Sequence, residues 1–425
     1  MAKLKGNCVM AQSGGPTAVI NSSLQGVIEE ATKHDCIEGI YAAQNGILGV
    51  LKEEVFDLRK EKPEAIKTLR RTPAAAAGSC RYKLKDITKS KTDYERILEV
   101  FKAHNIRYFF YAGGNDSMDT ADKLSKMAAE LKYDLIVMGV PKTIDNDLAI
   151  TDHCPGFGSV AKYVATTVME AGKDTDALYS SDTATVVETM GRNAGWIAAA
   201  AGCAARSPED APHLVYMPEA PLSLRKFEAD VRGVLERLGR CVIAVSEGVK
   251  DEKGNHISEV GGAFAKDAFG HAQLGGAGDA LASFVENAIK VKCRRARPGT
   301  AQREAMHFAS LTDVNEAYMV GQKAVQHAVA GTSGFMVTLV RESTKPYRCT
   351  TGMAKLSDIA NGEKLVPREW INAEGNHITQ ALRDYITPLM HGEAPVEIGP
   401  DGLPVYMRFQ RNFLDKKCGP WQSQK

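Results

Sequence analysis

The segment PKTIDND at residues 141–147 carries the side chains best suited to catalysis in this sequence. It presents a cation, a hydroxyl and two carboxylates within six residues, namely Lys142, Thr143, Asp145 and Asp147. Its first residue, a proline, favours an extended backbone, in which Thr143, Asp145 and Asp147 point to one face. A carboxylate can accept a proton from a substrate hydroxyl, and a lysine can neutralise phosphoryl oxygens. The segment is therefore equipped for phosphoryl transfer, although a solvated Asp/Asn turn explains the same residues.

Four other polar turns also follow apolar runs that read as strands. They are SGGPT (13–17), GGNDS (113–117), MGR (190–192) and SEG (246–248). In open α/β sheets, ligands bind outside the carboxyl ends of the strands, near helix N-termini that favour anions. Turn chemistry alone explains any one of these clusters. The five together favour a shared ligand site.

Single residues in these turns sharpen the interpretation. The planar guanidinium of Arg192 suits a phosphate or a carboxylate, and Glu247 can bind a sugar hydroxyl or cap a helix. Asp116, in GGNDS, places a negative charge where a phosphate would approach. The basic run at 293–303 is too short and too poor in aromatic residues for a nucleic-acid groove. It suits a sugar phosphate or a solvated turn, and the same holds for Arg81 in GSCRY.

Alternating strands and helices must position these turns. The expected strands span residues 6–15, 106–112, 134–140, 183–190, 213–219 and 240–248, and the expected helices span 18–32, 94–103, 119–131 and 224–238. This alternation predicts βαβ units around parallel sheets. Residues 344–425 have weaker periodicity and are expected to form a C-terminal extension packed on the core.

Length and composition exclude several classes of protein. The chain has 425 residues, enough for two domains, with 44% hydrophobic and 25% charged residues. A net charge of +1 gives no global attraction to nucleic acid or to an anionic membrane. Nine scattered cysteines without a C-x-x-C pair argue against a disulfide framework and fit a reducing cytoplasm. No segment reads as a signal peptide or a membrane span.

The order of the motifs resembles that of the 6-phosphofructokinases over residues 6–340. SGGPTAVIN, GGNDS, PKTIDND, ETMGRNAGW, SEG and AQR follow one another, and PKTIDND with GGNDS resembles the pyrophosphate-dependent branch. The resemblance implies an α/β fold of two Rossmann-like three-layer αβα domains facing across a cleft. It also implies reversible transfer of a phosphoryl group from pyrophosphate to the 1-hydroxyl of fructose 6-phosphate, with Mg²⁺ as cofactor. A cytoplasmic homodimer or homotetramer is implied as well, with no nucleic acid or membrane as partner.

The resemblance further implies roles for the residues at matching positions. The implied catalytic residues are Asp145 as the base, Lys142 and Asp116. Gly15, Arg81 and Asp116 are implied to bind the diphosphate donor. Thr143, Asp145, Met190, Gly191, Arg192, Glu247, Arg294 and Arg303 are implied to bind the sugar phosphate. Asn115 and Asp147 are implied to hold the metal.

Four positions depart from the pattern of relatives, three of them from the ATP-using branch. Asp116 replaces a glycine, and its carboxylate would repel a nucleotide's α-phosphate, a group that pyrophosphate lacks. Asn115 stands where many relatives have a metal-linked aspartate, and its amide oxygen is neutral. Thr300 and Thr183 replace a histidine and an arginine near the sugar phosphate.

The expected domains are 1–150 with about 294–330 for the donor, and 151–293 for the sugar phosphate. The second contains an insertion at about 262–292, and residues 331–425 are expected to pack on both domains. Three alternatives stay open: an ATP-dependent 6-phosphofructokinase, a non-catalytic regulatory subunit that binds sugar phosphate, and a different acceptor such as sedoheptulose 7-phosphate.

Overall fold

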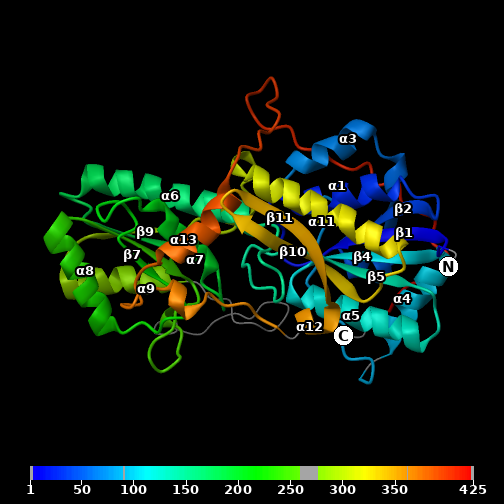
Figure 1. Cartoon of the computed structure of the whole chain (residues 1–425), viewed down its shortest axis with the longest axis horizontal. Helices are drawn as coiled ribbons and strands as arrows, with labels where there is room; N and C mark the ends of the chain where they lie inside the picture. The colour runs from blue at the N-terminus through cyan, green and yellow to red at the C-terminus, as the bar shows by residue number, and fades with distance from the viewer. Residues whose placement is uncertain (1–2, 90, 259–275, 361, 423–425) are drawn as a thin grey trace.

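Two mainly parallel sheets lie side by side along the long axis of the molecule (Figure 1). The computed structural model describes residues 3–89, 91–258, 276–360 and 362–422. The first sheet has the order β11 (Tyr347–Lys355), β10 (Phe335–Thr344), β5 (Ile136–Pro141), β4 (Ile106–Gly113), β1 (Gly6–Gln12), β2 (Ile37–Ala43) and β3 (Val55–Asp57). The second has the order β7 (Leu214–Tyr216), β8 (Cys241–Ser246), β6 (Ala184–Thr189) and β9 (Cys293–Ala296).

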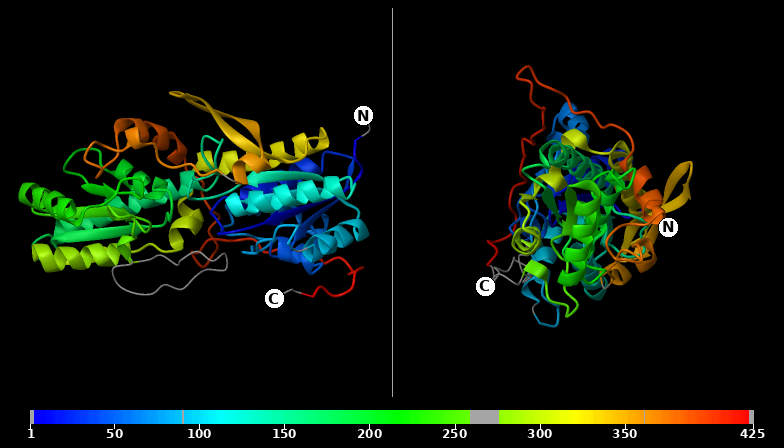
Figure 2. Two further views of the ribbon diagram at one scale, coloured as in Figure 1. Left: turned by 90° about the horizontal axis from the view of Figure 1, so that it is seen from below. Right: turned by 90° about the vertical axis from the view of Figure 1, so that its left-hand side faces the viewer.

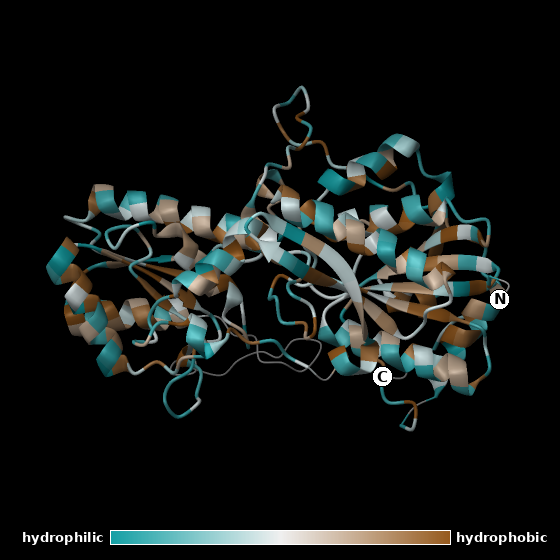
Figure 3. Ribbon diagram, viewed as in Figure 1, coloured by the Kyte–Doolittle hydropathy of each residue, from teal (hydrophilic) through white to brown (hydrophobic). Residues whose placement is uncertain are grey.

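Helices cover both faces of the first sheet because its strands are apolar on both sides. In β1, Cys8 and Met10 pack into the cluster under α1 (Ile20–Ala31) and α11 (Leu311–Val329). The alternate residues Val9 and Ala11 pack into the opposite cluster, under α2 (Ile47–Leu51), α4 (Thr92–Ala103), α5 (Asn115–Glu130) and α12 (Leu356–Ala360). Successive side chains of a strand point to opposite faces, so this alternation builds three layers. Figure 3 shows the mainly apolar strands between helices in which hydrophilic and hydrophobic residues alternate.

The second sheet is layered in the same way. Val187 of β6 faces the cluster formed with α6 (Phe157–Leu178) and α7 (Trp196–Ala201). Its neighbour Val186 faces the cluster formed with α8 (Leu224–Leu238) and α9 (Ala277–Phe284). The predicted α/β fold with parallel sheets is confirmed, and the helix predicted at 224–238 has those bounds.

One helix begins earlier than the sequence analysis expects. The apolar spacing predicted a helix from residue 119, but α5 starts at Asn115. Its first turn carries polar residues, which the hydrophobic pattern does not detect. Asn115 and Asp116 consequently lie at the N-terminal end of α5, which favours a negative charge.

The C-terminal part contacts both sheets. β10 pairs with β5 and with β11, so this hairpin extends the first sheet. α13 (Gln380–Ile386) packs into the cluster of α6 and α7 at the second sheet. The left view of Figure 2 shows the hairpin and α13 on the same side of the molecule. Leu414 then returns to the first sheet, where its N–H donates to the Val55 carbonyl at 2.8 Å.

The predicted insertion is described only in part. Residues 259–275 of the predicted insertion lie outside the described residues, and α9 follows them. Two short helices complete the fold, α3 (Pro63–Thr68) and α10 (Ala301–Glu304). Across the described part of the chain, every helix is too short or too polar to cross a membrane.

Candidate active site

The carboxyl ends of three parallel strands gather the predicted residues of the first sheet. Gln12, the last residue of β1, pairs with Ala112 of β4, and Gly113 pairs with Pro141 at the end of β5. The turns that follow these strands therefore meet at one edge of the sheet. They carry Gly15, Asn115, Asp116, Lys142 and Thr143.

Lys142 is buried against the glycine turn after β1. Its Nζ donates to the Gly15 carbonyl at 2.7 Å. A Cβ added to Gly14 would lie 3.2 Å from Lys142 Nζ, and one added to Gly15 would lie 3.1 Å from Arg303 Nη1. Gly14 also has a φ of +77°, which side chains rarely adopt. Because these glycines have no side chain, the turn leaves room for two cations, one just after β5 and one from α10.

The pKa of Lys142 is lowered to about 8, mainly by burial and in smaller part by the positive charges of Arg303 and Arg81. Asp145 and Asp147 oppose that change through their negative charges. The lysine is 3% exposed, so its charge acts in a poorly solvated place. Four predicted residues therefore influence one ammonium group electrostatically.

The segment that carries Asp145 is bent rather than straight, which corrects the expectation of an extended segment. The Asp145 N–H donates to Thr143 Oγ1 at 3.1 Å. Asn146 has a φ of +54°, in the left-handed region. A residue in that conformation breaks the alternation of an extended strand, so Thr143, Asp145 and Asp147 do not share a strand face.

Asp145 responds to charges from both halves of the molecule. Its pKa is raised to about 7, mainly by burial and in smaller part by the like charges of Asp147 and Glu247. Lys142, from the first sheet, and Arg192, from the second, lower it. A carboxylate with a pKa near neutrality and two cations around it is placed to accept a proton.

The second sheet contributes the turns after β6 and β8. Glu247 Oε1 accepts a hydrogen bond from the Gly191 N–H at 3.3 Å, and Ser246 Oγ donates to the Gly191 carbonyl at 2.5 Å. The Met190 N–H donates to Gln302 Oε1 at 3.1 Å, which ties this turn to α10 beside Arg303. Burial raises the pKa of Glu247 to about 6. The structure thus links Met190, Gly191, Glu247 and the helix that carries Arg303.

Asp116 has a partner that the sequence analysis missed. Its Oδ1 lies 3.2 Å from Lys83 Nζ, with the two side chains 35% and 54% exposed. Lys83 follows Arg81 by two residues, on the loop from 78 to 86. The sequence signal for this partner was a second cation close to Arg81 in GSCRYK. Charged loop residues are common, so this signal is weak.

Arg294 lies apart from the other predicted residues of this chain. It pairs with Thr185 in the β6–β9 ladder, five residues before Met190. At about 3.3 Å per residue, this separation is roughly 16 Å along β6. Its Nε donates to Asp182 Oδ2 at 2.8 Å.

The two predicted metal residues fit an oxygen-bound cation. Asn115 Oδ1 and Asp147 Oδ1 are both buried, and neither accepts a hydrogen bond from the residues that the structure describes. Buried polar atoms normally have a partner, and Mg²⁺ prefers carboxylate, carbonyl and amide oxygens. Asn115 follows β4 and Asp147 follows the neighbouring β5, so both belong to the same edge of the sheet.

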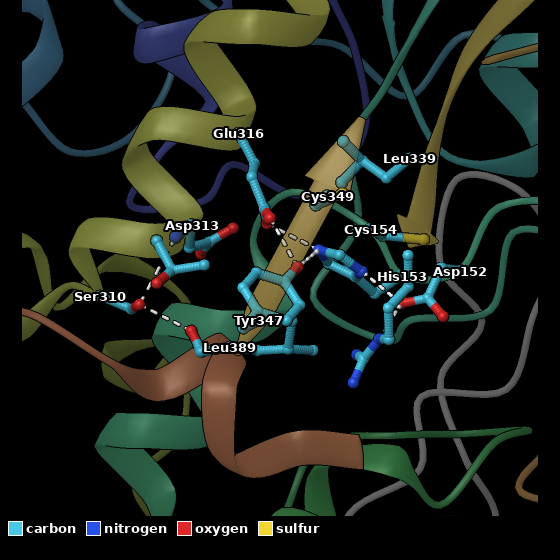
Figure 4. A network of polar contacts seen from close by, with 12 residues as sticks. Asp152, His153, Cys154, Ser310, Asp313, Glu316, Leu339, Tyr347, Cys349 and Leu389 are labelled. Carbon is cyan, nitrogen blue, oxygen red and sulfur yellow. Dashed lines mark hydrogen bonds and ion pairs between the residues drawn. The ribbon is translucent and has the colours of Figure 1, made fainter. Parts of the chain in front are cut away.

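A buried polar network that the sequence analysis did not anticipate joins the loop after β5 to α11 and β11 (Figure 4). His153 Nδ1 lies 2.7 Å from Asp152 Oδ2, and His153 Nε2 lies 2.6 Å from Glu316 Oε2. The Tyr347 hydroxyl donates to Glu316 Oε1 at 2.6 Å. Cys349 lies within the same cluster. Burial lowers the pKa of His153, but the carboxylates at its two ring nitrogens raise it more, so the net shift favours the imidazolium.

These features define a two-sheet α/β protein whose candidate ligand site combines the carboxyl ends of strands from both sheets. The sequence profile described as "Phosphofructokinase" matches residues 7–328, and the chain belongs to that family.

Named relatives are similar over almost the whole chain. A Xanthomonas campestris protein called pyrophosphate–fructose 6-phosphate 1-phosphotransferase is 47% identical, covering 98% of this chain and 99% of the relative. A Halomonas elongata protein of the same name is 47% identical over 97% and 98%. The crystal structure of a pyrophosphate-dependent phosphofructokinase from Marinobacter aquaeolei is 44% identical, with a TM-score of 0.89 and coverage of 99% and 100%.

Proposed function

We propose that the chain transfers a phosphoryl group reversibly from pyrophosphate to the 1-hydroxyl of fructose 6-phosphate, giving fructose 1,6-bisphosphate and phosphate. The names of its relatives support this reaction. The observation that carries it is Asp145, a carboxylate with a raised pKa, among Lys142 from one sheet and Arg192 and Glu247 from the other. Phosphoryl transfer needs a base for the acceptor hydroxyl and cations for the transferred group.

On the acceptor side, Asp145 takes the proton from the 1-hydroxyl. A pKa of about 7 matches a base that works near neutral pH. Thr143, bonded to the Asp145 N–H, keeps this carboxylate at the acceptor. The residues that bind the sugar phosphate in this proposal are Met190, Gly191, Arg192, Glu247 and Arg303.

On the donor side, the turn at Gly15 receives pyrophosphate while Arg81 and Lys142 neutralise its oxygens. Asp116 excludes a nucleotide through charge and bulk. Asn115 and Asp147 would hold Mg²⁺, which would supply positive charge to the phosphate oxygens. Their unpartnered oxygens support this assignment.

The proposal extends to the whole molecule. Residues 1–150 with about 294–330 bind the donor, 151–293 bind the sugar phosphate, and 331–425 pack on both. Arg294 pairs with β6 roughly 16 Å from Met190, at 3.3 Å per residue. In this proposal it binds the 6-phosphate of a sugar held by a second copy of the chain. This role requires the proposed homodimer or homotetramer, which we place in the cytoplasm.

A donor-swap assay tests the function. Purified protein is given fructose 6-phosphate with pyrophosphate or ATP, with and without Mg²⁺, and fructose 1,6-bisphosphate is measured with coupling enzymes. We expect turnover with pyrophosphate only when Mg²⁺ is present. Strong use of ATP without use of pyrophosphate would favour the ATP-dependent alternative. Binding of fructose 6-phosphate without turnover of either donor would favour a regulatory subunit.

A further inference from the structure

Residues 363–366 connect the loop of Asp145 to the second sheet. They lie 35 or more positions beyond the family match, which ends at residue 328. The Lys364 N–H donates to the Asp147 carbonyl at 2.8 Å. On the other side, the Lys364 carbonyl accepts from Trp196 Nε1 at 2.8 Å. One residue of the C-terminal part therefore bonds both to the Asp145 loop and to the first residue of α7.

The same segment also fixes the turn before α7. The Val366 N–H donates to Glu219 Oε1 at 3.0 Å, and the Gly195 N–H donates to the same oxygen at 2.9 Å. Gly195 follows Arg192 by three residues. Residues 363–366 therefore contact both the loop of Asp145 and the turn after Arg192, which the proposed reaction requires to act together.

The Lys364 side chain is surrounded by oxygen acceptors. Its Nζ donates to Asn146 Oδ1 at 3.2 Å, to the Thr151 carbonyl at 3.2 Å and to the Asp152 carbonyl at 2.7 Å. An ammonium group has three N–H donors, and each has an acceptor here. The Nζ also lies 5.4 Å from the centre of the Trp196 ring.

Asn146, the residue between the two aspartates, accepts a hydrogen bond from this lysine. It is fully buried with a φ of +54°, a conformation that is unfavourable for most side chains. Besides the bond from Lys364, its Oδ1 accepts from the Cys154 N–H at 3.0 Å. Its Nδ2 donates to the Tyr385 hydroxyl at 3.1 Å. Two of these three partners, Lys364 and Tyr385, come from the C-terminal part.

We propose that Lys364 is a positioning residue: it holds Asn146 in its left-handed conformation and so places Asp145 and Asp147 for the acceptor hydroxyl and the metal. The inference rests on the proposed function. Without the ammonium, Asn146 Oδ1 and two backbone carbonyls lose a charged donor, and the left-handed turn loses one of its supports. Groups that orient a metal ligand typically affect metal affinity or activity by about 10- to 100-fold when removed.

Lys364→Met tests the proposal, because methionine keeps most of the length and removes the charge. Lys162→Met is the matched control. Lys162 Nζ also binds C-terminal residues, the Gly392 carbonyl at 3.0 Å and Glu393 at 2.8 Å, and lies 4.7 Å from the Phe308 ring centre. Within the part of the chain that the structure describes, Lys162 makes no hydrogen bond to residues 143–147, so its loss affects stability without moving the aspartates.

Three measurements separate positioning from stability: kcat and KM for fructose 6-phosphate, Mn²⁺ binding followed by electron paramagnetic resonance, and the unfolding temperature. For K364M we expect kcat to fall about 10- to 100-fold, KM to change less than about 3-fold, and Mn²⁺ affinity to fall by a similar 10- to 100-fold factor. For K162M we expect kcat and Mn²⁺ affinity within about 3-fold of wild type. Equal effects of the two variants at equal unfolding temperatures would overturn the proposal.

Two further results keep the test decisive. If K364M does not fold, Tyr385→Phe takes its place, because it removes the hydroxyl that accepts from Asn146 and keeps the ring; an unchanged kcat would then contradict the positioning of this turn. If the wild type turns over neither donor, the proposed function fails. The Mn²⁺ affinities of K364M and K162M then decide the role of Lys364 alone.

Discussion

Replacing Asp116 with glycine is the sharpest perturbation of donor choice. Asp116 lies in the first turn of α5, with Lys83 Nζ at 3.2 Å. The pair is partly exposed, so its contribution to stability is at most about 1 kcal/mol. Loss of a negative charge at a helix start and the introduction of glycine each cost roughly 0.3–1 kcal/mol. The variant should therefore fold, with an unfolding free energy lower by about 1–2 kcal/mol.

The effect on ATP use should be larger than the effect on stability. Two unit charges 4 Å apart at an effective dielectric constant of 20 repel by about 4 kcal/mol. Lys83 offsets part of the charge of Asp116, and solvent screens part of the remainder. An effective repulsion of about 1–3 kcal/mol would be relieved, which corresponds to a gain of roughly 5- to 150-fold in kcat/KM for ATP.

Asp119→Gly is the matched control for this prediction. Asp119 lies one turn later in α5 and pairs with Lys123 at 2.6 Å, with 29% of its side chain exposed. The Asp119→Gly substitution removes a comparable charge from the same helix without altering the first turn of that helix. Both variants are assayed with ATP and with pyrophosphate. If kcat/KM for ATP rises equally in both variants, or in neither, Asp116 does not select the donor through its charge.

Three other predictions concern the catalytic loop and the buried network. Asp145→Asn should lower kcat by about 10²- to 10⁴-fold at an unchanged unfolding temperature; a kcat within 10-fold of wild type would exclude Asp145 as the base. Lys142→Met should lower kcat with pyrophosphate by about 10²-fold or more, and a change confined to KM would contradict its role in stabilising the transferred group. Burial lowers the pKa of His153, but Glu316 and Asp152 raise it more, so the net shift is upward. The imidazolium therefore stabilises the fold below pH about 6.5, and this contribution is lost as the pH rises through the raised pKa. Urea unfolding from pH 6 to 9 should show that the unfolding free energy of the wild type falls relative to that of His153→Gln. The same pH dependence in both proteins would refute this contribution of His153.

The groups that face His153 support the direction of its pH effect. Asp152 and Glu316 contact its two ring nitrogens, and the Tyr347 hydroxyl lies 3.5 Å from Nε2. Arg341 Nε lies 3.1 Å from Asp152 Oδ2, so it shares that carboxylate with the imidazolium. Cys349 completes the cluster, and burial raises the pKa of its thiol to about 12, so it stays neutral throughout the pH range.

Local sequence patterns were sufficient for several of the helices and strands and for the turns that follow those strands. The amphipathic spacing of 224–238 fixes α8 because its apolar stripe must face a sheet. The strands before Gly113 and Pro141 are apolar on both faces, as buried parallel strands are. Because these strands are parallel neighbours, their carboxyl ends lie at the same edge of the sheet, whichever residues follow them. The grouping of Gly15, Asp116 and Lys142 could therefore be predicted.

The features of the site that could not be predicted from the sequence depend on contacts between residues far apart in the chain. The bend at Asn146 depends on Lys364 and Tyr385, which lie 218 and 239 positions further along the chain. Arg294 is nine residues from Arg303 in sequence, yet the register of β9 against β6 sets it at the other end of the strand. Neither local propensity nor spacing carries this information.

The central claim is that pyrophosphate donates a phosphoryl group to fructose 6-phosphate. ³¹P nuclear magnetic resonance of the purified protein with both substrates and Mg²⁺ tests it most directly. We predict that pyrophosphate disappears while fructose 1,6-bisphosphate and phosphate appear in equal amounts, and that the reaction runs backward from these two products. Pyrophosphate that remains intact while ATP is consumed, or that is hydrolysed without formation of the bisphosphate, would contradict the claim.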